Sequence, residues 1–180
     1  MSRVTSEVEI EILKTGGKKL AEIRERLLDE VKPGAVPLQI DELAKKLIRE
    51  AGGYPSFMTV NGYKWATCIS VNEGVVHGIP SKISLKEGDV VSIDVGLLYK
   101  GFHTDTSWTI LVQNQSFDFA QDRKSIPSTS LRTGKNQNEK EKFIKIGQVA
   151  LEKAIKEARV GNRIGHISKA TPKLWNEYPP

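Results

Sequence analysis

Two aspartates stand inside adjacent predicted strands, where a carboxylate is uncommon. The runs Val90–Leu98 and Phe102–Val112 alternate apolar and polar residues, and Lys100-Gly101 between them suits a two-residue turn. Because side chains alternate across a strand, Asp94 and Asp105 fall on one face of this hairpin, diagonal to each other. Two neighbouring carboxylates repel each other and lose hydration, so they need a shared proton, a nearby lysine or arginine, or a metal ion.

The hairpin separates a polar face from an apolar one. A carboxylate that bridges two metal ions about 3.5–4 Å apart is a known arrangement for hydrolysis by activated water. The alternative is that both aspartates lie on the solvent side of an ordinary two-layer sheet and bind nothing. The predicted polar face holds Ser92, Asp94, Gly96, His103, Asp105, Ser107 and Thr109, and the apolar face holds Ile93, Val95, Leu97, Phe102, Trp108 and Ile110.

A histidine and a cysteine precede the hairpin. His77 lies between a β-like run, Ala66–Val71, and a Gly-Ile-Pro turn, a position from which an imidazole can enter a cleft. A structural role is the alternative, as for many single histidines. Cys68 is the one cysteine of the chain, so an internal disulfide is excluded. A buried apolar thiol without a catalytic role is one interpretation of Cys68.

Helices are predicted on both sides of these strands. Ser6-Glu-Val-Glu9 has the form of a capping box, and apolar residues at helical spacing continue to Val31, before Lys32-Pro33-Gly34 ends the helix. A second helix is predicted from about Gln39 to Ala51. Helical spacing returns at Phe143, and a helix, a glycine break and a second helix then recur around Gly161, as a weak internal repeat. The alternative is two unrelated amphipathic helices that each precede a glycine.

Composition limits the class of protein. A chain of 180 residues with 38% hydrophobic and 27% charged residues is typical of a globular domain, and no apolar run reaches the roughly 18–20 residues that span a bilayer. The first residues have no apolar signal region, so we expect a cytoplasmic protein without membrane association. The net charge of +5 is spread along helices and mixed with glutamates, which does not favour a specific nucleic-acid partner.

Several short motifs follow one another in a specific order: Val31-Lys-Pro-Gly34, Pro55-Ser-Phe57, Cys68-Ile-Ser-Val-Asn-Glu73, Val76-His-Gly-Ile-Pro80, Leu85-Lys-Glu-Gly-Asp-Val90, Ile93-Asp-Val95 and Gly101-Phe-His-Thr-Asp-Thr-Ser107. Together these motifs resemble the type I methionine aminopeptidase family. The resemblance implies an α+β pita-bread fold, in which two pseudo-symmetric αβ halves enclose a dinuclear metal site. On this basis we expect residues 1–112 to form the first half, residues 113–142 a flexible polar insertion, and residues 143–180 the start of a second half that is only begun.

The resemblance also implies an activity and a set of roles. Family members remove the initiator methionine from nascent polypeptides when the next residue is small, with two divalent metal ions (Co, Mn, Fe or Zn) that activate water. Asp94 would bind one metal ion and Asp105 would bridge both. His77 would contact the substrate near the scissile amide, and Tyr63 and Cys68 would line the methionine pocket. We expect a monomer that meets nascent chains, with the ribosome as a further partner.

The sequence departs from the family at three places. The family completes its metal site with one histidine and two glutamates of the second half, which this chain does not reach, so we expect little or no activity from the chain alone. Lys64-Trp65 replaces a proline and a small residue, and the segment after Val112 replaces a short connection. The alternatives are a non-catalytic pita-bread module that binds peptide, ribosome or RNA, and a different aminopeptidase or proline-directed peptidase.

Overall fold

The computed structural model describes residues 6–114 and 135–170. The chain forms two compact units, residues 1–127 and residues 128–180. The described residues of the first unit form two helices, a short 3₁₀ helix and an antiparallel sheet, and those of the second unit form two helices. No helix within the described ranges is both long and apolar enough to cross a membrane.

Helix α1 (Glu7–Asp29) begins at the predicted capping box. The Glu9 N–H donates to Ser6 Oγ at 3.2 Å, and the Ser6 N–H donates to Glu9 Oε2 at 3.0 Å. Helix α2 (Pro37–Glu50) begins slightly before the predicted Gln39. Proline suits the first helical position because its missing N–H would have no partner inside the helix there.

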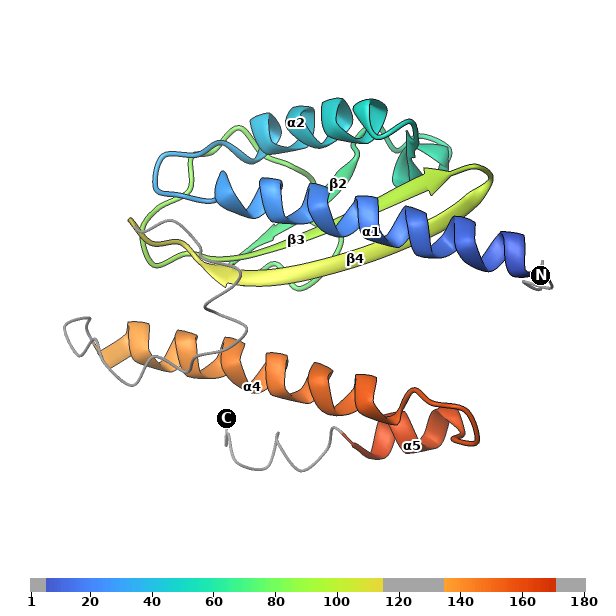
Figure 1. The fold of residues 1–180 in the computed structure, drawn as a ribbon. Helices are drawn as coiled ribbons and strands as arrows, with labels where there is room; N and C mark the ends of the chain where they lie inside the picture. Colours follow the sequence, from blue (N-terminus) through green and yellow to red (C-terminus); the bar gives the residue numbers. More distant parts are fainter. Residues whose placement is uncertain (1–5, 115–134, 171–180) are drawn as a thin grey trace. The chain divides into compact units, whose positions relative to one another are not determined.

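The sheet contains β1 (Tyr54–Pro55), β2 (Thr67–Val71), β3 (Val90–Tyr99) and β4 (Phe102–Leu111), and β3 pairs with all three other strands (Figure 1). Strands β3 and β4 form the predicted hairpin, with Tyr99 opposite Phe102. The turn residues Lys100 and Gly101 have φ of +47° and +86°, the left-handed values that a two-residue hairpin turn requires.

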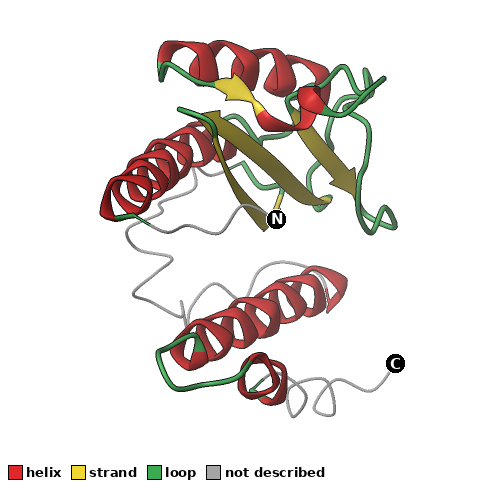
Figure 2. Ribbon diagram, turned by 90° about the vertical axis from the view of Figure 1, so that its right-hand side faces the viewer, coloured by secondary structure: helices red, strands yellow, loops and turns green. Residues whose placement is uncertain are grey.

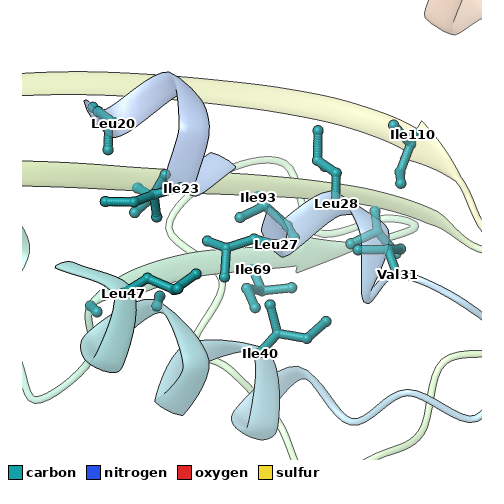
Figure 3. Close-up of a cluster of buried hydrophobic side chains, with 14 of the residues drawn as sticks. Leu20, Ile23, Leu27, Leu28, Val31, Ile40, Leu47, Ile69, Ile93 and Ile110 are labelled. Atoms are coloured by element: carbon teal, nitrogen blue, oxygen red, sulfur yellow. The ribbon is translucent and has the colours of Figure 1, made fainter. Parts of the chain in front are cut away.

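Helices α1 and α2 pack on the apolar face of this sheet (Figures 1 and 2). Ile93, Val95 and Leu97 of β3 are fully buried there, as predicted from their alternation with polar residues. Leu27 of α1 lies close to Ile93 in the centre of this core (Figure 3). Because the helices occupy the apolar face, the face with the two aspartates is left for other contacts.

One more element, the 3₁₀ helix η1 (Ser56–Thr59), follows β1 directly. The sequence patterns predict neither β1 nor η1. Both are shorter than the periodic patterns that identify helices and strands.

The second unit contains α4 (Lys135–Glu157) and α5 (Ile164–Lys169). Helix α4 begins at Lys135 and not at Phe143, so the prediction of an unstructured segment is wrong for residues 135–142, and residues 115–134 lie outside the described residues. The link between α4 and α5 contains Gly161 at φ +93°, and the link between α1 and α2 contains Gly34 at φ +87°. The predicted order of helix, glycine break and helix is therefore present in both units.

Candidate metal and substrate site

The polar face of the sheet collects residues from β2, β3 and β4. Cys68 is the Cα partner of Asp94 on one side, and Ser107 is its partner on the other. Gly96 is the partner of Asp105, as the sequence predicted. Because partners in an antiparallel pair point to the same side, Cys68, Asp94 and Asp105 share the face that α1 and α2 leave uncovered.

Asp94 and Asp105 interact directly. Asp94 is partly buried and Asp105 is exposed. Burial of Asp94, the charge of Asp105 and a hydrogen bond between the two side chains raise the pKa of Asp94 to about 6, against opposing effects of His77 and the Val95 backbone. The repulsion expected from the sequence is therefore present, and a bound cation would relieve it.

The two carboxylates match divalent metal ions in donor type but do not form a complete site by themselves. Oxygen donors bind hard and borderline divalent cations, and a carboxylate with a raised pKa gains most from a nearby positive charge. In residues 6–114 and 135–170, no group of three or more His, Cys, Asp or Glu side chains could hold a metal ion. Asp94 and Asp105 would thus be part of a larger ligand set.

His77 reaches this region through a loop that folds back along β2. The Ile69 N–H donates to the Gly78 carbonyl at 2.7 Å, and the Gly78 N–H donates to Ser70 Oγ at 3.2 Å. A Cβ on residue 78 would collide with the Ile69 carbonyl, so only glycine permits this approach. The loop leaves His77 exposed at φ +55°, near enough to Asp94 to lower its pKa.

Aromatic side chains flank the carboxylates on the β2 side. The Tyr63 hydroxyl donates to the Thr67 carbonyl at 2.8 Å and lies 3.2 Å from Cys68 Sγ. Phe57 and Trp65 both pack edge-to-face on Tyr63, with ring centroids 6.5 and 5.3 Å away. The sequence predicted Tyr63 and Cys68 at one site, and the structure places them in contact.

Cys68 is suited to be an apolar wall and not a nucleophile. It is 7% exposed, and burial raises the pKa of its thiol, which Asp94 and Asp105 raise further against the effect of the hydrogen bond between Cys68 and Tyr63. A thiol with a raised pKa stays protonated at neutral pH, whereas the thiolate is the form that attacks substrates or binds metals.

The sequence interpretation missed Asp41 of α2, which is fully buried. Its Oδ1 accepts hydrogen bonds from the Ala66 N–H at 2.8 Å, the Thr67 N–H at 2.9 Å and the Thr67 hydroxyl at 2.8 Å. Lys45 Nζ lies 3.0 Å from Oδ2. Asp41 thereby fixes the start of β2, one residue before Cys68. A carboxylate on the apolar side of an amphipathic helix was the available signal for this residue.

Most of the chain is similar to metallopeptidases. A model of metallopeptidase family M24 matches residues 11–179. Methionine aminopeptidase 1 of Bacillus subtilis (strain 168) is 34% identical over 162 residues, which are 90% of this chain and 57% of that protein. A methionine aminopeptidase of Clostridium perfringens is 36% identical over 163 residues, 91% of this chain and 57% of that protein. The chain therefore spans little more than half the length of these relatives.

Solved structures show the same likeness. A methionine aminopeptidase of Thermotoga maritima superposes with a TM-score of 0.80 at 31% identity, over 98% of this chain and 63% of that one. A prolidase of Pyrococcus furiosus superposes with a TM-score of 0.71 at 19% identity, over 97% of this chain and 44% of that one, which is a likeness of fold alone. These superpositions confirm the predicted pita-bread fold, of which this chain covers a part.

Proposed function

Because the chain belongs to metallopeptidase family M24, we propose that it supplies part of the site of a metal-dependent methionine aminopeptidase. The reaction is removal of the initiator methionine from new polypeptides whose next residue is small. The observation that carries the proposal is that Asp94 and Asp105 lie next to each other on the polar face of the sheet, with the pKa of Asp94 raised to about 6. The relatives named methionine aminopeptidase support the choice of substrate.

In this proposal Asp94 would bind one divalent metal ion and Asp105 would be a ligand of both ions, with Co, Mn, Fe or Zn as the candidate metals. When bound, such ions polarise a carbonyl group and lower the pKa of water. A mixed oxygen and nitrogen ligand set does not select sharply among these metals. The site would need further ligands, because no group of three or more ligands is present among the described residues.

The other residues have roles towards the substrate. His77 is exposed and acts on the pKa of Asp94, and in this proposal it donates a hydrogen bond to the amide that is cleaved and thereby orients it. Tyr63 and Cys68 offer an apolar wall for the methionine side chain. A thioether gains a favourable contact from aromatic rings, which Tyr63 and its neighbours Phe57 and Trp65 provide.

The proposed partners follow from this activity. The substrate is the free N-terminus of a nascent polypeptide, which implies action in the cytoplasm near the ribosome. We propose a monomeric protein, in which a single sheet face serves one polypeptide end at a time.

A second candidate, a non-catalytic module that binds peptides, the ribosome or RNA, is favoured by one observation. The described residues supply two carboxylates and no larger group of metal ligands. Such a module would bind its partner whether or not metal is present. The two candidates therefore differ in the metal dependence of peptide binding.

Calorimetry with the purified chain distinguishes the metal-dependent aminopeptidase from the non-catalytic module. We expect Met-Ala-Ser to bind more tightly with Mn²⁺ than with EDTA, and more tightly than Ala-Ala-Ser, with both differences reduced in Asp105→Asn. Equal binding of the two peptides would refute the methionine pocket, and metal-independent binding would favour the module. Methionine release should stay near background, since two aspartates do not make a complete site. Release at a rate typical of an aminopeptidase would contradict this expectation.

A further inference from the structure

The 3₁₀ helix η1 lies directly against the polar face of the sheet. A Cβ built on Gly96 would be 2.7 Å from the Ser56 Cβ and 2.9 Å from Phe57 Cε1, so both side chains occupy the space above this glycine. Gly96 is the Cα partner of Asp105. The start of η1 is therefore immediately beside one of the proposed metal-binding carboxylates.

One side-chain hydrogen bond links η1 to strand β4. Ser56 Oγ and His103 Nδ1 are 2.6 Å apart, and His103 precedes Asp105 by two residues on the same face of β4. None of the residues of η1 is fully buried. A second side-chain bond, from the Thr59 hydroxyl to the Ser56 carbonyl at 2.7 Å, stays inside the turn. The bond to His103 thus reaches from η1 to the hairpin.

The position of η1 affects the aromatic wall, by which we mean the packed rings of Phe57, Tyr63 and Trp65. Phe57 follows Ser56 and packs on Tyr63, whose hydroxyl contacts Cys68 next to Asp94. If η1 moved away from Gly96, the Phe57 ring would move with it and the wall would open. The hydrogen bond between Ser56 and His103 is thus one restraint on the orientation of this wall relative to the carboxylates.

We propose that His103 is a positioning residue of the substrate pocket, which acts through Ser56 to hold η1 and Phe57 beside Asp105. The identification of the pocket rests on the proposed function, but the attachment of η1 does not. Both partners are polar and accessible, so the bond adds little to global stability and its effect is local.

The test uses the full chain and variants that separate the two imidazole nitrogens. In His103→Asn the amide group lies where Nδ1 lies and can still bond Ser56, whereas in His103→Gln it lies nearer the position of Nε2. Ser56→Ala removes the other partner. Ser81→Ala is a matched control, because it removes a partly buried serine, as Ser56 is, that accepts from the Ile83 N–H at 3.3 Å in a different loop.

Two measurements are needed. The Val60 N–H donates to the Phe57 carbonyl at 3.1 Å and reports on η1 through its hydrogen exchange. We expect Ser56→Ala and His103→Gln to speed this exchange about fivefold and to weaken binding of Met-Ala-Ser, with Mn²⁺ present, about fivefold. His103→Asn and Ser81→Ala should match the wild type in both, and all melting temperatures should agree within about 2 °C.

Each outcome decides the inference. Unchanged exchange in Ser56→Ala and His103→Gln, or equal losses in His103→Asn and His103→Gln, would refute the attachment through Nδ1. Faster exchange with unchanged peptide affinity would refute the positioning role. If the wild type binds no methionyl peptide, the proposed function fails, and the exchange rates still decide whether His103 holds η1.

Discussion

Replacing Asp94 with asparagine should stabilise the metal-free protein at neutral pH, although it removes a proposed ligand. Burial raises the pKa of Asp94 to about 6 from an ordinary value of 3.8, and the charge of Asp105 contributes. The folded state therefore holds the Asp94 proton more tightly than the unfolded state does, and ionisation of this side chain destabilises the fold. Asparagine is close to the neutral carboxyl in shape and cannot ionise.

The magnitude follows from the pKa difference. Each pKa unit corresponds to about 1.36 kcal/mol, so the difference of roughly two units gives about 3 kcal/mol as an upper limit. Because Asp94 is only partly buried, solvent screening reduces this figure, and we expect a gain of about 1–2 kcal/mol in the free energy of unfolding. The melting temperature should rise by about 5 °C or more.

The contribution of Asp94 to the free energy of unfolding depends on pH. Wild-type stability should fall as the pH rises from about 4 to about 6, where Asp94 loses its proton in the folded state, and this contribution should then stay constant. In Asp94→Asn this fall is absent. The two proteins should therefore unfold alike near pH 4 and differ most near pH 7.

Urea unfolding in EDTA at several pH values is the appropriate assay, with circular dichroism as the signal. Adding Mn²⁺ at pH 7 should stabilise the wild type and have a smaller effect on the variant, because a cation relieves the repulsion that asparagine has already removed. The reasoning is refuted if Asp94→Asn is no more stable than the wild type at pH 7 in EDTA, or if the difference is the same at all pH values.

Three further predictions concern the site and its supports. Asp105→Asn should weaken Mn²⁺ binding about tenfold or more in calorimetry, and identical titrations of variant and wild type would contradict the proposed ligand role. Asp41→Ala should lower the free energy of unfolding in urea by about 3–5 kcal/mol, because three buried donors of Ala66 and Thr67 lose their acceptor; a loss below about 1 kcal/mol would exclude this anchoring role. Gly96→Ala should lower the free energy of unfolding by about 1–3 kcal/mol in a thermal melt, because the new Cβ would meet η1. Gly17→Ala in α1 is the control and should be neutral or stabilising, because a Cβ there meets nothing within 4 Å. Equal effects of the two changes would be inconsistent with close packing at Gly96.

Local patterns in the sequence identify the main elements and the central carboxylate pair. The capping box of α1, the breaks at Gly34 and Gly161 and the turn at Lys100-Gly101 depend on residues close together in the chain. Alternation along β3 and β4 fixes which side chains share a face, since a shift by one residue would bury the polar set. Asp94 and Asp105 are therefore recognisable as a pair from strand alternation alone.

Contacts between distant segments cannot be predicted from such local patterns. Asp41 and Thr67, or Ser56 and His103, are far apart in sequence, and each residue alone has the type of an ordinary surface residue. Nothing in a periodic pattern specifies which helix lies over which strand, because that choice depends on how side chains from several elements fill one space.

The sequence by itself thus determined the hairpin, its polar face and the two aspartates on it, because these depend on local spacing and strand alternation. Only the tertiary structure decided that Asp41 anchors the start of β2, that η1 lies on Gly96, and that Phe57, Tyr63 and Trp65 form a wall next to Cys68. The physical reason is that close packing and buried hydrogen bonds select among distant partners, and this selection is made only when the elements come together.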